Sequence, residues 1–233
     1  MIRCCVFDVG ETLVRDDRYW GLWADWLKVP RHTLSALVGA VVALGRDNAD
    51  ALRLVRPGID LAAEYAAREA AGMGERLEEE GLYPDARPAL GALRQAGLKV
   101  VVAGNQTARA GELLRALELP VDAVATSGEW GVAKPDPRFF ARVVELAGVA
   151  PQEVLYVGDA PVNDVLAAKA AGLRAAHIRR GPWGHLWADD PRLEAADWPI
   201  TALTDLVPIL TDLGDFPQPS DQRPIVRYHD HEV

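Results

Sequence analysis

The chain has 233 residues, of which 49% are hydrophobic and 25% are charged, a composition typical of globular proteins rather than of disordered or fibrous ones. Its net charge is -9, from 25 Lys+Arg against 34 Asp+Glu, and no basic run stands out, which argues against a nucleic acid as main partner. At roughly 150 residues per domain, the length predicts one domain with a large insertion or two small domains.

The N-terminal segment predicts a cytoplasmic protein. The chain runs from Met1 into Asp8 without the long apolar region or the cleavage pattern of a signal peptide. The longest apolar stretch, residues 33–45, is shorter than the roughly 20 residues that cross a bilayer, so no membrane contact is expected. Cys4 and Cys5 are neighbours whose side chains should point to opposite faces of a strand, so we expect two buried free thiols and no disulfide.

Short runs rich in β-branched residues predict five strands, at residues 3–7, 99–103, 122–126, 154–157 and 174–178. Amphipathic stretches between the later runs predict helices at residues 86–95, 108–117, 137–147 and 163–171. Strands that alternate with helices imply right-handed crossovers and therefore an α/β fold with a doubly wound, Rossmann-like parallel sheet. Ligands of such sheets bind at the carboxyl ends of the strands.

One long interval breaks this alternation, because residues 15–82 contain only helical patterns. Helices are expected there at residues 19–27, 32–44, 49–54 and 61–71. The sequence therefore predicts a core domain made of residues 1–14 and 83–213, interrupted by an all-helical subdomain at 15–82. Residues 214–233 are rich in proline and lack periodicity, which predicts an irregular C-terminal tail.

Tryptophans recur in the first predicted helix of the insertion. Trp20, Trp23 and Trp26 are spaced by three residues, so we expect them to pack inside the insertion or against the core rather than to line a pocket. Residues 181–184 predict a turn after the fifth strand. Trp183 in that turn is compatible with the rim of a site or with an interface.

Polar residues stand at or after the ends of the predicted strands. The first strand runs into Asp8-Val9-Gly10-Glu11-Thr12, and the second runs into Gly104-Asn105. Lys134 follows the third strand, and the fourth ends in Gly158-Asp159 with Asp164 beyond it. Because the carboxyl ends of parallel strands meet at one edge of a sheet, we expect these residues to line one crevice.

Two carboxylates and a lysine in one crevice fit phosphoryl transfer. An aspartate that attacks a phosphoryl group needs a cation, because its own charge repels the substrate, and Asp8 and Asp159 can hold Mg²⁺ between them. Lys134 can offset phosphate charge, while backbone N–H groups at Gly104 and Asn105 can hold phosphate oxygens. Each residue alone has an ordinary explanation, such as a helix cap or a surface lysine, but their order and placement together favour the site.

These motifs resemble those of the haloacid dehalogenase-like (HAD) superfamily hydrolases, with matches at residues 8–12, 102–105, 134–135 and 158–164. The resemblance implies a Rossmann-like core with a helical cap inserted after the first motif. It implies that Asp8 is the nucleophile of a covalent aspartyl intermediate, steadied by Lys134. It also implies that the Asp8 and Asp159 carboxylates and the Gly10 main-chain carbonyl bind Mg²⁺, with Asp164 supporting the metal indirectly.

Two residues depart from the pattern of the superfamily's phosphatases. Gly10 stands where they usually carry a second aspartate, a general acid and base worth roughly 10²–10⁴-fold in rate. Glu11 is the obvious substitute, but as the next residue it should point elsewhere. Whether Glu11 or a residue of the cap replaces the acid is left open. Gly104 stands in place of the usual Ser or Thr, so a hydroxyl contact to phosphate is lost.

The sequence thus predicts a Mg²⁺-dependent phosphatase that acts on a small phosphorylated metabolite, either with a good leaving group or with low turnover. A non-catalytic protein that binds a phosphorylated ligand or a protein partner is the alternative that Gly10 and Gly104 favour. Dehalogenases of the superfamily also lack the second aspartate, but they use no metal and usually lack the motif at Gly158-Asp159. The phosphonate-cleaving branch relies on a cap lysine, and the only lysine between residues 15 and 82 is Lys28. The substrate and the oligomeric state are left open.

Overall fold

A computed structural model describes residues 1–211 of the chain and shows a parallel sheet between layers of helices. The sheet has six strands in the order β3-β2-β1-β4-β5-β6, and each neighbouring pair is parallel. The strands are β1 (Cys4–Phe7), β2 (Lys99–Gly104), β3 (Ala123–Thr126), β4 (Val154–Gly158), β5 (Arg174–Ile178) and β6 (Trp198–Ile200). This is the strand order of Rossmann sheets, and it confirms the predicted α/β fold.

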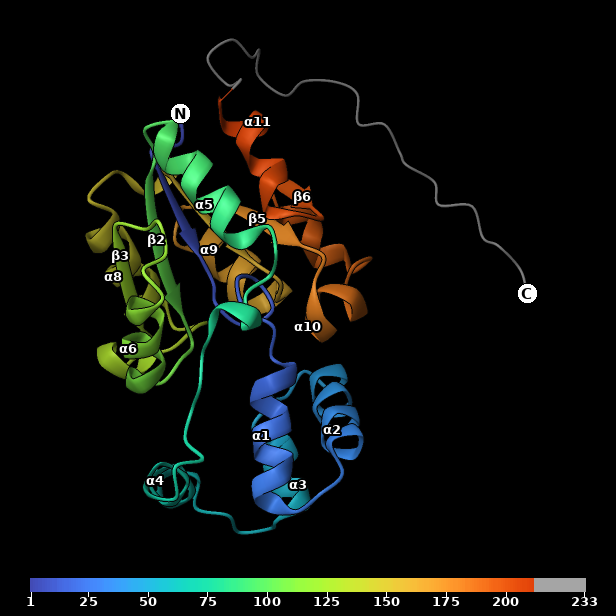
Figure 1. The fold of residues 1–233 in the computed structure, drawn as a ribbon. Coiled ribbons are helices and arrows are strands. Elements are labelled where there is room, and N and C mark those ends of the chain that lie inside the picture. Colours follow the sequence, from blue (N-terminus) through green and yellow to red (C-terminus); the bar gives the residue numbers. More distant parts are fainter. Residues whose placement is uncertain (212–233) are drawn as a thin grey trace.

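Helices lie on both faces of the sheet (Figure 1), and one apolar cluster holds each face. The alternation of side chains along β1 places Cys5 in the cluster with α5 (Ala86–Gln95) and Cys4 in the cluster with α8 (Pro137–Ala147). Both thiols are free and fully buried. The prediction of two unpaired cysteines on opposite faces is therefore confirmed.

The other helices of the core are short. They are α6 (Ala108–Ala116), α7 (Ser127–Trp130), α9 (Ala167–Ala170), α10 (Gly181–Leu186) and α11 (Leu206–Thr211), with 3₁₀ turns η2 (Pro151–Glu153), η4 (Pro191–Ala195) and η5 (Leu203–Asp205). A further 3₁₀ turn, η1 (Glu79–Gly81), lies in the segment that returns from the insertion to the core. No helix within residues 1–211 is long and apolar enough to cross a membrane. The irregular tail predicted for residues 214–233 lies outside the described residues.

The core differs from the predictions in several details. The helix expected at residues 163–171 begins earlier, as the π-helical turn η3 (Pro161–Leu166), and continues as α9. The turn predicted at 181–184 is the first part of α10, because a proline in the first turn of a helix needs no backbone donor. Strand β6 was not predicted; it is an edge strand of three residues with a proline in the middle, which such a position tolerates.

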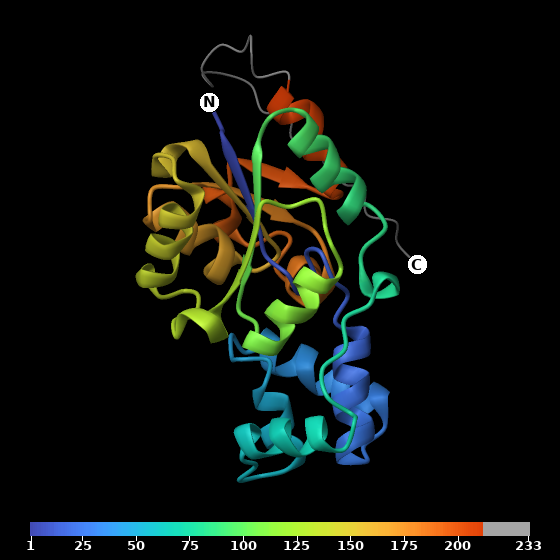
Figure 2. The ribbon, with the colours of Figure 1, turned by 60° about the vertical axis from the view of Figure 1, so that its left-hand side comes forward.

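The insertion contains four helices between residues 17 and 70, as predicted. They are α1 (Asp17–Leu27), α2 (Arg31–Ala43), α3 (Asp50–Val55) and α4 (Leu61–Ala70). Figures 1 and 2 show them beyond the carboxyl ends of the strands, on the side toward which β1 runs. Trp20 and Trp23 lie buried in the insertion's own apolar cluster, and Trp183 of α10 packs against that cluster. The tryptophans therefore serve packing, and Trp183 lies where the core meets the insertion.

The chain segments that lead into and out of the insertion are tied together at its base. Val14 forms isolated β-bridges with both Gly10 and Leu82. The backbone N–H of Tyr83 donates to the carbonyl of Leu13 over 2.9 Å. The insertion is therefore attached to the core by a paired double connection rather than by two separate linkers.

Arg180 is the buried centre of this junction. Its guanidinium donates to the Thr12 carbonyl over 2.9 Å, forms an ion pair with Asp85, and lies 4.3 Å from the centre of the Tyr83 ring. The Asp85 carboxylate also accepts a hydrogen bond from the backbone of Leu203 over 2.7 Å. One ion pair thus joins the loops after β1 and β5 to the segment that returns from the insertion.

We expect Asp85→Ala to lower the free energy of unfolding by about 3 kcal/mol, because it leaves the buried charge of Arg180 without a partner. The control is Glu145→Ala, which breaks an exposed pair with Arg142 and should change stability by less than about 0.5 kcal/mol. Urea denaturation of both variants measures the difference. If Asp85→Ala and Glu145→Ala lower the free energy of unfolding by the same small amount, the Arg180 junction has no structural role.

Candidate active site

Three buried carboxylates meet at the carboxyl ends of two neighbouring strands. Asp8 follows β1 and Asp159 follows β4, while Asp164 lies in η3. Each offers a ligand oxygen, and these atoms all lie within 4.8 Å of one another. The structure therefore brings together the acidic residues that the sequence analysis singled out, although they are far apart in the chain.

Lys134 binds two of these acids directly. Its ammonium lies 2.7 Å from Asp8 Oδ1 and 2.6 Å from Asp164 Oδ1. It also lies 5.2 Å from the centre of the Tyr156 ring, whose hydroxyl donates to the Ala103 carbonyl over 2.7 Å. Burial by itself lowers the pKa of Lys134, but the charges of Asp164 and Asp8 outweigh it and raise that pKa well above the usual value. The group is therefore a fixed positive charge.

One lysine does not balance three buried carboxylates. Burial is the main cause that raises the pKa of Asp8 to about 6, with Lys134 opposing it. Burial, together with the charges of Asp164 and Asp8, raises the pKa of Asp159 well above its usual value. Asp159 Oδ2 is buried without a hydrogen-bond partner within the described residues. Such an orphaned anionic oxygen fits a site for a hard cation such as Mg²⁺.

The oxygens of Asp164 are already engaged by the protein. Oδ1 accepts from Lys134 over 2.6 Å, and Oδ2 accepts from the backbone N–H of Ala160 over 2.8 Å. His177, buried in β5, forms a hydrogen bond of 3.0 Å with the main-chain carbonyl of Asp159, and burial lowers its pKa. These contacts fit Asp159 as a direct ligand, with Asp164 and His177 holding the loop around it.

The side chain of Asn105 holds Lys134 in place. Its amide nitrogen donates to the Lys134 carbonyl over 3.0 Å, and its oxygen accepts from the Lys134 N–H over 2.8 Å. The preceding residue, Gly104, leaves room for the Asp8 carboxylate: a Cβ there would lie only 2.5 Å from Asp8 Oδ1. Asn105 and Gly104 thus fix the relative positions of Lys134 and Asp8.

Glu11 is anchored in its loop by contacts of its own side chain. It adopts a left-handed backbone conformation with φ 52°, and its carboxylate accepts from the Tyr83 hydroxyl and, over 3.2 Å, from the backbone N–H of Asp16. A Cβ on Gly181 would lie 2.4 Å from Glu11 Cγ, so the side chain is closely packed there. Glu11 therefore shapes the loop after β1.

Asp16 is a carboxylate near the site that the sequence analysis did not select. A Cβ on Gly10 would lie 3.1 Å from Asp16 Oδ2 and 3.2 Å from Asp16 Oδ1. Desolvation and the charges of Glu11 and Asp8 raise the pKa of Asp16 well above its usual value, and the charge of Asp16 in turn contributes to the raised pKa of Asp159. An aspartate just before a helix is ordinarily a helix cap, so the position of Asp16 in the sequence does not mark it as a functional residue.

The sequence profile of the haloacid dehalogenase-like hydrolases matches residues 2–172. The chain belongs to this family. Among curated HAD-like relatives, phosphoserine phosphatase of Thermus thermophilus is 33% identical over 166 residues, which are 60% of this chain and 67% of the relative. Hexitol phosphatase A of Escherichia coli is 30% identical over 228 residues, 92% of this chain and 98% of the relative. The match to glyceraldehyde 3-phosphate phosphatase of Methanopyrus kandleri covers only 58% of that protein.

Solved structures of the family share the fold. The HAD-hydrolase YfnB of Bacillus subtilis, solved with bound magnesium, superposes with a TM-score of 0.65 at 19% identity and covers 90% of this chain and 98% of its own. L-2-haloacid dehalogenase of Xanthobacter autotrophicus gives a TM-score of 0.57 at 22% identity, with the same two coverages of 90% and 98%. At these identities the likeness shows a common fold.

We expect Gly104→Ala to destabilise the protein by about 1–3 kcal/mol, because its Cβ must displace Asp8 or the strand backbone. Gly39→Ala is the control: this glycine lies in α2, and a Cβ there meets nothing within 4 Å, so stability should rise by about 0.4–1 kcal/mol. Thermal and urea denaturation of the two variants measure the contrast. A Gly104→Ala protein as stable as wild type would mean that Asp8 has free space to move.

Two isosteric substitutions in the acid cluster should change the stability of the protein in opposite directions. Asp159→Asn removes an unpartnered buried charge, so in chelator the variant should be about 1 kcal/mol more stable than wild type. Asp164→Asn leaves either Lys134 or the Ala160 N–H without its acceptor, so it should lose about 2 kcal/mol.

Magnesium provides the second comparison for these variants. Wild type should be stabilised by added Mg²⁺, because a ligand that binds only the folded state raises the unfolding temperature. Asp159→Asn should lose most of this shift. A Mg²⁺ shift that is unchanged in Asp159→Asn would contradict the assignment of Asp159 as a metal ligand.

Proposed function

We propose that the chain is a Mg²⁺-dependent phosphatase that acts on small phosphorylated metabolites through an aspartyl-phosphate at Asp8. The observation that carries the proposal is the position of the Asp8 carboxylate, 2.7 Å from the Lys134 ammonium and beside Asp159, whose buried Oδ2 has no partner within residues 1–211. A nucleophile, a fixed cation and a free ligand oxygen are what phosphoryl transfer through an aspartate requires.

Each residue has a defined task in this reaction. Asp8 attacks the phosphorus atom, and Lys134 holds the attacking carboxylate and offsets the charge of the phosphoryl group. Asn105 keeps Lys134 in position through its backbone, and the residues after β2 lie at the same edge of the sheet. When bound, Mg²⁺ supplies positive charge that lets an anionic nucleophile approach an anionic substrate. Asp8, Asp159 and the Gly10 carbonyl would hold it.

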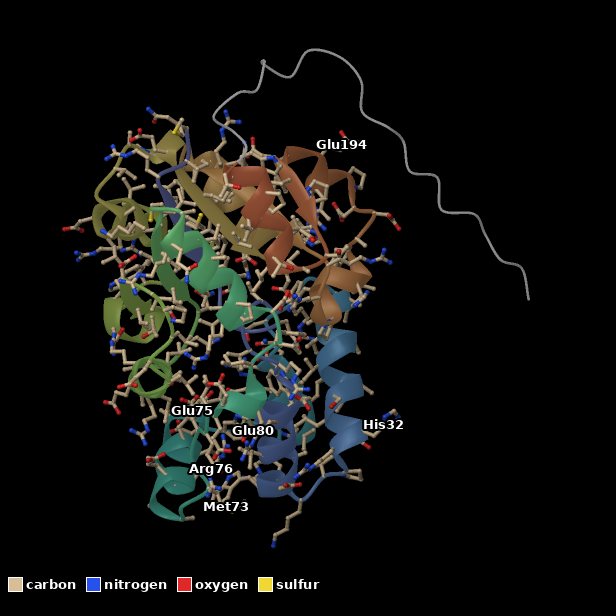
Figure 3. All side chains as sticks on the ribbon, turned by 45° about the horizontal axis from the view of Figure 1, so that its top comes forward. His32, Met73, Glu75, Arg76, Glu80 and Glu194 are labelled. Carbon is tan, nitrogen blue, oxygen red and sulfur yellow. The ribbon has the colours of Figure 1, made fainter. Side chains whose placement is uncertain are left out.

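The helical insertion fits the role of a cap over this site. Helices α1–α4 lie beyond the strand ends that carry the acids (Figures 1 and 2). Glu75, labelled in Figure 3, accepts a hydrogen bond from Thr107 at the start of α6, so the insertion touches the core close to the end of β2. We infer that residues 15–82 form a cap that encloses the substrate and excludes water.

The choice of a phosphate monoester as substrate is supported by the relatives. Phosphoserine phosphatase and hexitol phosphatase A are named for small phosphorylated compounds. The phosphonate-cleaving alternative needs a lysine of the cap near the acids, but Lys28 is exposed at the end of α1 that lies away from the sheet (Figure 1). A dehalogenase needs no metal, so dehalogenation does not explain why the buried Oδ2 of Asp159 has no hydrogen-bond partner among the described residues.

The test measures phosphate release from 4-nitrophenyl phosphate and acetyl phosphate, with Mg²⁺ and with chelator, for wild type and Asp8→Asn. We expect turnover that requires the metal and falls at least about 10³-fold in the variant, since the nucleophile is lost. The isosteric control is Asp122→Asn on the far edge of the sheet, before β3, which should retain activity.

Other outcomes have distinct meanings. Turnover that survives in chelator or in Asp8→Asn would contradict the proposed route. Chloride release from a 2-haloacid in chelator, without phosphate release, would assign the site to dehalogenation. Binding of inorganic phosphate without any turnover would assign the chain to the non-catalytic alternative.

A further inference from the structure

Position 10 carries no aspartate, but another carboxylate, that of Asp16, lies at the same place. A side chain on Gly10 would start at a Cβ that lies 3.1 Å from one carboxylate oxygen of Asp16 and 3.2 Å from the other. The carboxylate of Asp16 thus stands beside the space into which a residue at position 10 would project. A short side chain at position 10 would therefore project into the space that the Asp16 carboxylate occupies.

The carboxylate of Asp16 has no structural task in the described part of the chain. Asp16 is the residue before α1, yet its side chain accepts no capping hydrogen bond from the helix. Its backbone is held on both sides, because its N–H donates to Glu11 Oε1 over 3.2 Å and its carbonyl accepts from Trp20 over 3.0 Å. A fixed backbone with an unengaged, half-buried carboxylate is typical of a group placed for chemistry rather than for folding.

The carboxylate of Glu11, the residue after Gly10, cannot take the place of Asp16. Glu11 is bound by the Tyr83 hydroxyl and by the Asp16 N–H, and it is packed against Gly181. Moving it toward Asp8 would break these contacts and the left-handed turn at φ 52°. Asp16 therefore remains as the carboxylate next to Gly10 that is free to contact a substrate.

We propose that Asp16 is the general acid and base of this phosphatase, in place of the aspartate that Gly10 lacks; the inference rests on the proposed function. In the first step an Asp8 oxygen bonds to phosphorus, the bond from phosphorus to the leaving oxygen breaks, and Asp16 gives its proton to that oxygen to form the alcohol. In the second step Asp16 takes a proton from water, whose oxygen attacks phosphorus. The bond from phosphorus to Asp8 breaks, which releases phosphate and restores both carboxyl groups to their starting states.

Rapid mixing with 4-nitrophenyl phosphate tests the proposal, because this substrate needs little acid help to leave but its aspartyl-phosphate still needs a base. Asp16→Asn should release about one nitrophenol per site in a fast burst and then turn over roughly 10²-fold more slowly than wild type. Phosphorylated protein should accumulate and be visible by intact mass. With 2-glycerol phosphate, an alkyl ester, the variant should lose the burst as well.

Two further variants separate chemistry from structure. Asp17→Asn alters the adjacent, exposed acid of the same helix end and should keep both phases within about twofold of wild type. Gly10→Asp combined with Asp16→Ala returns a carboxylate to the loop and should turn over at least about tenfold faster than Asp16→Ala alone. The Mg²⁺-induced rise in unfolding temperature should be the same in Asp16→Asn and wild type.

The outcomes that overturn the inference are distinct from failure of the phosphatase assignment. Wild type without Asp8-dependent turnover would overturn both. Asp8-dependent turnover that Asp16→Asn leaves intact would overturn the role of Asp16 alone. If Asp16→Asn loses the burst and the later turnover equally and also loses the Mg²⁺-induced rise in unfolding temperature, Asp16 is a metal ligand and the role of Asp16 is overturned. The role is also overturned if the variant with Gly10→Asp and Asp16→Ala turns over no faster than Asp16→Ala alone.

Discussion

One buried ammonium group holds the candidate site together. Lys134 contacts Asp8 and Asp164 over 2.7 and 2.6 Å, and the third acid, Asp159, lies within the same cluster. Desolvated like charges repel strongly, so the acids can lie close together only where a cation is fixed between them. The remaining excess of negative charge favours the binding of a second cation. The position of Lys134, set by Asn105 and Tyr156, therefore decides how the carboxylates of Asp8 and Asp164 are held.

The loop after β1 both carries Asp8 and attaches the insertion to the core. It carries Asp8 at one end and leads into the insertion at the other, and its backbone turns back so that residue 16 approaches residue 10. The Arg180 junction holds the same loop through the Thr12 carbonyl. The same few residues thus attach the insertion to the core and position the acids of the candidate site.

Much of the fold was predictable because it depends on local patterns. Apolar runs and helical periodicity placed the first five strands and the helices of the insertion. What the sequence did not reveal depends on partners that are distant in the chain or on weak local signals. Strand β6 has only three residues, and the helix start at Pro182 has the composition of a turn.

The same distinction applies to the site. Asp8, Lys134 and Asp159 stood at strand ends and could be selected from topology. The clamp of Asn105 on Lys134 joins residues 29 positions apart, and the approach of Asp16 to Gly10 requires the left-handed backbone at Glu11, which a non-glycine residue rarely adopts. Tertiary contacts of this kind leave no trace in spacing or composition.

The two free thiols of β1 make the central strand a natural reporter of the opening of the sheet. Cys4 and Cys5 are the only cysteines of the chain, and both are fully inaccessible on opposite faces of the strand between β2 and β4. Burial raises the pKa of Cys4 to about 11, so little reactive thiolate exists while the sheet is intact. Alkylation of these thiols therefore follows the separation of the sheet layers rather than local fraying, and movements of the insertion leave it unchanged.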